Sequence, residues 1–295
     1  MPKKSGLKID GQRLAVFEAR RKEAMAEAMV LKKRFFEKKI RVLGVSGSMR
    51  DKFDMAQEDS TSEWLLENCL DEAKKLGAET KLLKLRQYKI NPCKSCYSTT
   101  NAQCHFKCTC YPEGPGGDDM TNKLYDECLW ADVFVFATPV NNFKMSSLMA
   151  LFIDRLISMD GSLKPADPKN SKNKELNIAH TKFVEAKATD EFGSGFLKRF
   201  TGKIGGIIVS GHEAGAALTI APLFMALNHY GLLFPPFSNM YAMGSVCEGT
   251  YTDKKKLQTP CYEKEARQLA QNLITAARVA KRTDDYWWTY DNSAD

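Results

Sequence analysis

The chain has 295 residues, of which 43% are hydrophobic and 27% are charged, so it can bury a sizeable core and is not intrinsically disordered. Its 43 lysine and arginine residues exceed its 36 acidic residues by seven, an excess too small to indicate a nucleic-acid-binding protein. The N-terminus lacks the apolar stretch of a secretory signal, and no window of 18 uncharged apolar residues occurs. We therefore expect a cytoplasmic protein without a membrane span.

The predicted elements begin with an N-terminal helical arm, residues 1–39. Apolar residues recur at spacings of three and four over 12–38, which predicts an amphipathic helix that docks on the body or on another subunit. One domain is expected over 40–285, followed by a tail, 286–295, in which two tryptophans are expected to be packing anchors. The domain's predicted strands are 40–45, 81–85, 131–137, 203–209 and a segment within 232–242, and its predicted helices are 62–76, 119–130, 146–158, 213–230 and 262–282.

Five strands that alternate with helices predict an α/β fold, a doubly wound five-stranded parallel sheet with right-handed crossovers. The polar, lysine-rich stretch 160–202 is interpreted as an insertion that lies over the body. Ligands of such sheets bind beyond the carboxyl ends of the strands. The loops after the first, third and fourth strands are therefore the candidate site.

The first loop offers small hydroxyl residues, a glycine and one arginine. It contains Ser46, Ser48 and Arg50, and the next helix opens with Ser60, Thr61 and Ser62. Ser60 and Glu63 have the spacing of a capping box. Hydroxyls at a helix N-terminus suit a phosphate, although the loop is neither a Walker A nor a GxGxxG motif and is equally consistent with an ordinary capped loop.

The second and third loops offer groups suited to a flat heteroaromatic ring. In the second loop Pro139 is expected to stiffen a turn, the Asn141 and Asn142 amides can bind a ring edge, and Phe143 can cover a ring. An ordinary turn remains the alternative. The third loop contains Ser210, Gly211 and His212; it can line the same crevice, or His212 can simply cap the helix that follows.

Together with Ser146-Ser147 and Phe152-Ile153-Asp154-Arg155, these loops resemble the flavodoxin-like NADPH-dependent FMN reductase superfamily over 40–160 and, more loosely, over 203–280. A cysteine-rich loop, 91–118, closes with Asp118-Asp119-Met120 and resembles the iron–sulfur flavoprotein branch of that superfamily. The resemblance implies non-covalent FMN, with its phosphate at Ser48, Arg50, Ser60 and Ser62 and its ring along Pro139, Val140, Asn141, Asn142 and Phe143. The 210–212 loop would approach the ring's other side, or the same site in a neighbouring subunit, since such proteins are commonly homodimers or homotetramers.

The chain departs from the superfamily pattern in two places. Residues 51–59 separate Arg50 from the helix start and lengthen the first loop. Thr99 stands where the branch has the third cysteine of two CxxC steps, of which Cys93 and Cys96 fit the first.

The cysteines are unevenly placed. Five of the nine fall within 91–118, namely Cys93, Cys96, Cys104, Cys108 and Cys110, and an odd count with one dense cluster does not indicate a disulfide framework. Four thiolates can hold a [4Fe–4S] cluster, for which Cys93 and Cys96 with Cys104 and Cys108 are favoured. Zinc, bound by four cysteines or by three and His105, and a loop without metal are the alternatives. Cys69 and Cys128, on predicted helices, are expected in the core.

These features predict an FMN-dependent oxidoreductase. By the resemblance, it would take electrons from NAD(P)H or ferredoxin and pass them to a small acceptor such as a quinone. A cluster, if bound, would relay single electrons, and no side chain need act as a nucleophile. Two alternatives remain at this point: a non-enzymatic electron carrier or redox sensor on the same fold, and a zinc-stabilised interaction module without flavin.

Overall fold

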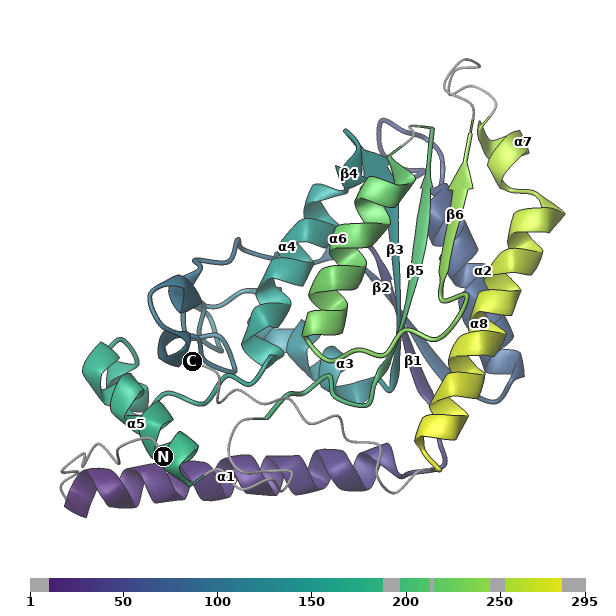
Figure 1. Ribbon diagram of the computed structural model, residues 1–295. Coiled ribbons are helices and arrows are strands. Elements are labelled where there is room, and N and C mark those ends of the chain that lie inside the picture. The colour runs from purple at the N-terminus through teal and green to yellow at the C-terminus, as the bar shows by residue number, and fades with distance from the viewer. Residues whose placement is uncertain (1–10, 188–196, 213–214, 245–252, 283–295) are drawn as a thin grey trace.

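A parallel sheet forms the centre of the molecule. The structure, a computed structural model, describes residues 11–187, 197–212, 215–244 and 253–282. Its sheet has the order β2-β1-β3-β5-β6, in which all neighbours are parallel, and β4 pairs antiparallel with β3 (Figure 1). The strands are β1 (Arg41–Ser46), β2 (Glu79–Lys84), β3 (Val133–Asn141), β4 (Lys144–Met145), β5 (Ile204–Gly211) and β6 (Asn239–Met243). The predicted α/β fold with five parallel strands is confirmed.

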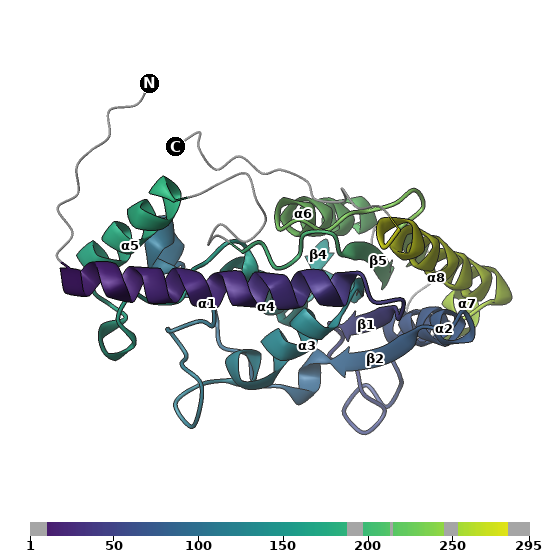
Figure 2. The same ribbon diagram turned by 90° about the horizontal axis from the view of Figure 1, so that it is seen from below.

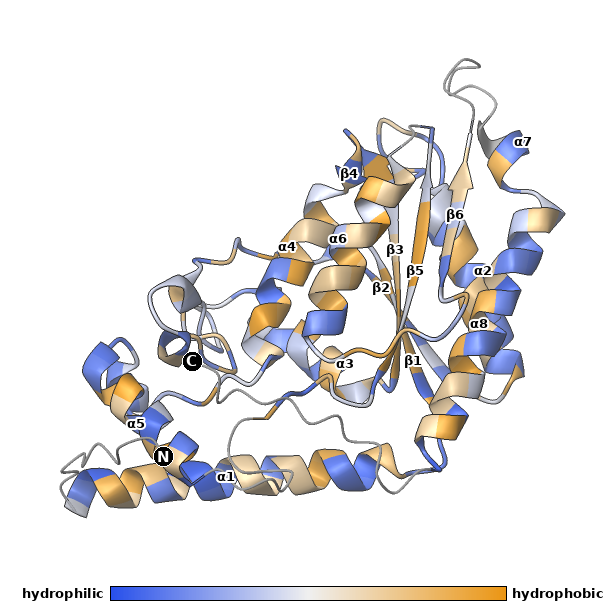
Figure 3. Cartoon of the chain, in the orientation of Figure 1, coloured by the Kyte–Doolittle hydropathy of each residue, from blue (hydrophilic) through white to orange (hydrophobic). Residues whose placement is uncertain are grey.

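Helices cover both faces of the sheet, as Figure 1 shows. The helices are α1 (Gly11–Phe35), α2 (Thr61–Lys75), α3 (Tyr125–Trp130), α4 (Ser147–Leu156), α5 (Lys174–Ala186), α6 (Ala216–His229), α7 (Asp253–Leu257) and α8 (Pro260–Ala280). Successive side chains of a strand point to opposite faces, so Phe134 and Phe136 of β3 pack with α3, α4 and α6, whereas Val133 and Val135 pack with α2 and α8. This two-sided burial explains why the strand is almost entirely apolar, and apolar residues gather at the sheet in Figure 3.

The described part of the N-terminal arm contains one long helix, α1, which runs along the underside of the body (Figure 2). Its side chain Phe17 is fully buried and stacks on His180 of α5, with ring centroids 5.0 Å apart. Glu27 of α1 accepts hydrogen bonds from Arg199, at 2.8 Å for the shorter. The stretch 160–202 is therefore more than a polar insertion, because it contains α5, against which Phe17 of α1 packs.

The remaining differences from the predicted elements are local. The helix expected over 119–130 begins as a π-helical turn, Met120–Leu124, before α3. Cys69 and Cys128 are buried, as expected of core cysteines. The two tryptophans of the tail lie outside the described residues, and no helix among the described residues is long and apolar enough to cross a membrane.

Candidate functional site

The three candidate loops meet at the carboxyl edge of the sheet, because their strands are neighbours. In the register, Ser46 of β1 lies beside Ala137 of β3, and Pro139 of β3 lies beside Ser210 of β5. The Gly47 amide donates to the Ala137 carbonyl at 2.8 Å, and the Ser146 hydroxyl donates to the Gly47 carbonyl at 2.5 Å. The first and second loops are thus hydrogen-bonded to each other.

The first loop forms a cradle of hydroxyl groups at the N-terminus of α2. The side chains of Ser48, Ser60 and Ser62 are all buried, and the Ser60 and Ser62 hydroxyls lie 3.0 Å apart. Ser60 caps the helix, since its hydroxyl accepts a hydrogen bond from the Glu63 amide. Arg50 is 41% exposed and lies 4.0 Å from Glu58. Hydroxyl donors at the positive end of a helix, with one accessible cation, suit a phosphate group.

The expected capping box is only half formed. The Glu63 carboxylate does not return to the Ser60 amide but binds Arg86 through both oxygens, at 2.6 and 3.1 Å, and Lys84 at 2.6 Å. It also accepts a hydrogen bond from Ser46 at 2.8 Å. Burial raises the pKa of Glu63, but these hydrogen bonds outweigh burial and hold the pKa below its usual value. Two cations at the end of β2 stabilise a buried carboxylate more than one backbone amide does, because they offset its charge as well as donating hydrogen bonds.

The second loop is a β-hairpin. Pro139 does not stiffen a turn as expected, because β3 continues through Pro139 and Val140 to Asn141. The turn lies at Asn142 and Phe143, whose φ angles of 50° and 62° are those of a tight two-residue hairpin turn. The Phe143 side chain is 56% exposed, so its ring lies at the surface of the site.

The third loop packs closely against this hairpin. A Cβ atom on Gly211 would lie 2.9 Å from the Val140 Cβ, and one on Gly215 would lie 2.7 Å from the Phe143 Cα. These two glycines allow the backbones to approach. The N-cap residue of α6 is Gly215, three positions after His212. The structure therefore brings the predicted residues of all three loops to one edge of the sheet.

The cysteine-rich loop gathers its thiols beside α4. The Cys96 thiol forms side-chain hydrogen bonds with Cys104 and Cys110, and Cys108 forms one with Cys110. The hydrogen bond with Cys104 raises the pKa of Cys96 to about 11, and the same bond lowers the pKa of Cys104. Among the described residues, however, no three His, Cys, Asp or Glu side chains are grouped as they would be around a metal ion.

Two residues near the cysteines have other partners. Thr99, at the position of the missing cysteine, is exposed and donates its hydroxyl hydrogen to the Cys96 carbonyl at 3.2 Å. His105 is buried, and its Nδ1 lies 2.8 Å from the Thr109 hydroxyl. Burial lowers the pKa of His105 to about 4, so its ring is neutral at pH 7.

A buried ion pair closes the base of the cysteine-rich loop. Arg155 of α4 is 1% exposed and donates to the Asp118 carboxylate at 2.5 Å and to the Asn91 carbonyl at 3.0 Å. Asp118 in turn accepts a hydrogen bond from the Asn91 amide at 2.9 Å. The guanidinium also lies 4.7 Å from the ring centre of Tyr111. One arginine therefore holds both ends of the loop.

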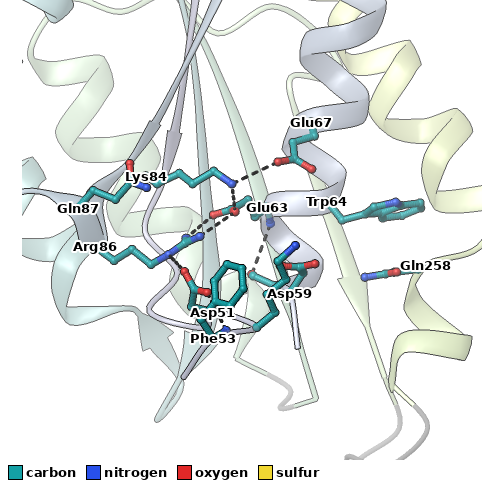
Figure 4. Close-up of a pocket in the computed structure, with 12 residues that line it drawn as sticks. Asp51, Phe53, Asp59, Glu63, Trp64, Glu67, Lys84, Arg86, Gln87 and Gln258 are labelled. Carbon is teal, nitrogen blue, oxygen red and sulfur yellow. Dashed lines mark hydrogen bonds and ion pairs between the residues drawn. The ribbon is translucent and has the colours of Figure 1, made fainter. Parts of the chain in front are cut away.

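A cavity of about 580 Å³ lies beside the hydroxyl cradle and was not predicted from the sequence. Figure 4 shows the ion pairs of Glu63, Lys84 and Arg86 on one side of it and Trp64 with Gln258 on the other. Its lining residues are Asp51, Lys52, Phe53, Asp59, Ser60, Glu63, Trp64, Glu67, Lys84, Arg86, Gln87 and Gln258. The one signal in the sequence was the pair of cations at the end of the second predicted strand, Lys84 within it and Arg86 just after it.

Residues 40–177 match the model of a protein family described as NADPH-dependent FMN reductase. A curated relative from Archaeoglobus fulgidus, described as an iron-sulfur flavoprotein, is 32% identical over 115 residues, which are 39% of this chain and 49% of the relative. The match thus spans about half the length of that relative.

Two solved structures are similar to this chain. The structure of RosB with bound 8-demethyl-8-formylriboflavin-5'-phosphate has a TM-score of 0.58 at 18% identity and covers 84% of this chain and 82% of its own. The structure of a flavone reductase has a TM-score of 0.48 at 17% identity, and the match covers 85% of this chain and 66% of the reductase chain. At such identities the likeness to RosB shows the fold alone.

Proposed function

Because residues 40–177 belong to the NADPH-dependent FMN reductase family, we propose that this chain is an FMN-dependent oxidoreductase. The observation that carries the proposal is the meeting of the hydroxyl cradle, the β3–β4 hairpin and the 210–212 loop at one edge of the sheet. Hydroxyl groups suited to a phosphate and the hairpin proposed to line the ring both lie at that edge.

The residues have separate tasks in this proposal. The cradle of Ser48, Ser60, Thr61 and Ser62 would hold the phosphate, with Ser46 supporting the loop and Arg50 supplying charge. Val140, Asn141, Asn142 and Phe143 would line the ring together with Pro139, and Ser210, Gly211 and His212 would approach it from β5. Bound FMN would supply the electron-transfer chemistry, while the protein binds it, orients it and limits its access to water.

The proposal also names classes of electron donor and acceptor. We expect NAD(P)H or ferredoxin as the donor and a small molecule such as a quinone as the acceptor. We also expect a homodimer or homotetramer, because α6, beside the ring platform, exposes Leu218 and Met225 by 62% and 68%. Light scattering of the purified protein would measure the oligomeric state.

We also propose that the cysteine-rich loop binds a [4Fe–4S] cluster, with Cys93, Cys96, Cys104 and Cys108 as its ligands. Soft thiols suit iron, and a curated relative is described as an iron-sulfur flavoprotein. Iron, zinc and sulfide analysis of anaerobically purified protein distinguishes the cluster from zinc and from a loop without metal. The cluster is ruled out if the protein holds flavin but less than one iron per chain.

The flavin is tested by titrating flavin-free protein with FMN and comparing two charge reversals. Arg50→Glu removes the cation proposed to face the phosphate, and we expect FMN affinity to fall by about tenfold or more. Arg267→Glu is the matched control, since Arg267 is 43% exposed and paired with Glu263 as Arg50 is with Glu58. Equal effects of the two variants would exclude Arg50 from the phosphate site, and a chain that binds no flavin would refute the proposed function. Reduction of bound FMN by NAD(P)H without turnover of any acceptor would favour the electron carrier.

A further inference from the structure

We propose that the cavity beside the hydroxyl cradle binds the nucleoside half of a dinucleotide, with its ribose unphosphorylated. This inference rests on the proposed function, because it takes Ser60 as part of the phosphate cradle. The same Ser60 lines the cavity, so a ligand whose phosphate lies in the cradle can continue directly into it. The cavity's volume of about 580 Å³ is typical of small-molecule sites.

The aromatic and amide groups of the cavity suit a nucleobase. Trp64 of α2 and Phe53 of the long first loop offer two ring faces for stacking (Figure 4). Gln87 and Gln258 bring carboxamides from two further parts of the chain, and neither side chain has a hydrogen-bond partner among the described residues. A carboxamide can donate to and accept from one base edge at the same time. Stacking faces with unpaired amides beside them are what a heteroaromatic base needs.

The charges of the cavity favour a nucleoside over a further phosphate. Its lining has four carboxylates, Asp51, Asp59, Glu63 and Glu67, and three cations, Lys52, Lys84 and Arg86. Lys84 and Arg86 already bind Glu63, and Arg86 also binds Asp51 at 3.0 Å. Lys84 also pairs with Glu67, at 3.5 Å, which leaves Asp59 to repel a phosphate on the ribose. A carboxylate, by contrast, accepts hydrogen bonds from free ribose hydroxyls. NADH therefore fits this cavity better than NADPH does.

Two dinucleotides can supply this nucleoside group. In FAD it is attached to the flavin's own phosphate, so one cofactor would occupy the cradle and the cavity together. In NADH it belongs to the electron donor, which would bind beside FMN. The long loop of residues 51–59 has a role in either case, because it carries Asp51, Lys52, Phe53 and Asp59 to the cavity.

The test uses calorimetric titration of the full chain with AMP and with adenosine 2',5'-bisphosphate, and titration of flavin-free protein with FMN and FAD. We expect AMP to bind at least tenfold more tightly than the bisphosphate. Phe53→Ala and Trp64→Ala should each weaken AMP binding by about tenfold, as loss of a stacking partner does. Phe237→Ala is the matched control, because Phe237 is 81% exposed, as Phe53 is 88% exposed, and lies outside the cavity. Phe53 is too exposed for its removal to unfold the chain.

The results show whether FAD or NADH supplies the nucleoside, and they test the nucleoside site separately from the proposed function. FAD binding more tightly than FMN, with the difference lost in Phe53→Ala, identifies the cofactor as the source. Equal flavin affinities with AMP competing against NADH identify the donor. Absence of AMP binding, or equal AMP binding by Phe53→Ala, Trp64→Ala and Phe237→Ala, overturns the inference. AMP binding by a chain that binds no flavin refutes the proposed function and leaves a nucleoside site.

Discussion

Replacing Arg155 by methionine tests whether the buried ion pair holds the cysteine-rich loop on α4. The side chains of Arg155 and Asp118 are 1% and 0% exposed, so methionine fills the space of the arginine but leaves a carboxylate buried without its cation. Removing one member of a buried pair costs about 3–5 kcal/mol of the free energy of unfolding. The Asn91 and Thr121 amides still donate to Asp118, which places the expected loss near 3 kcal/mol.

Urea denaturation at pH 7 measures this loss, and the rate at which the loop's thiols react with an alkylating reagent reports local opening. Arg267→Met is the control, because the half-exposed pair of Arg267 and Glu263 contributes at most about 0.5 kcal/mol. The variant Arg155→Met/Asp118→Leu should recover most of the stability, since an apolar pair leaves no charge buried. The reasoning is refuted if Arg155→Met loses no more than Arg267→Met and its thiols react no faster.

Three further predictions concern two buried histidines, Gly211 of the third loop and the Ser146 cap of α4. Burial lowers the pKa of His105 and of His180 to about 4, so between pH 6.5 and 4 the unfolded chain binds protons that the folded chain does not. The free energy of unfolding should therefore fall as the pH falls from 6.5 to 4, by up to about 3 kcal/mol per histidine. His180→Phe should make urea denaturation less dependent on pH over this range. Gly211→Ala places a methyl group against Val140 and should cost about 1–3 kcal/mol by thermal denaturation, with a weaker FMN affinity by titration; unchanged values would contradict the close packing of the third loop. Ser146→Ala removes the cap of α4 and the bond to Gly47 and should cost about 1–2 kcal/mol, and an unaltered urea midpoint would speak against that link.

The sequence pattern was sufficient to predict the sheet with helices packed on it and the edge of the sheet at which the candidate site lies. A strand such as β3 is a short run of apolar residues, and this composition indicates that both of its faces are buried. Because the strands are parallel, the loops after Ser46, Asn141 and Gly211 lie at one edge of the sheet. The Ser60 cap was also readable, because a cap involves residues three positions apart.

Only the tertiary structure decided which distant groups become partners. Glu63 has the spacing of a capping residue, yet it turns to Arg86, 23 positions away, because folding brings the end of β2 beside α2. Asp118 and Arg155, 37 positions apart, pair for the same reason. The apolar periodicity of 12–38 showed that the arm needs a partner, but not that α5 receives Phe17 or that the main body receives Phe35. Periodicity reports which face of an element is buried, whereas the choice of partner depends on how the whole chain packs.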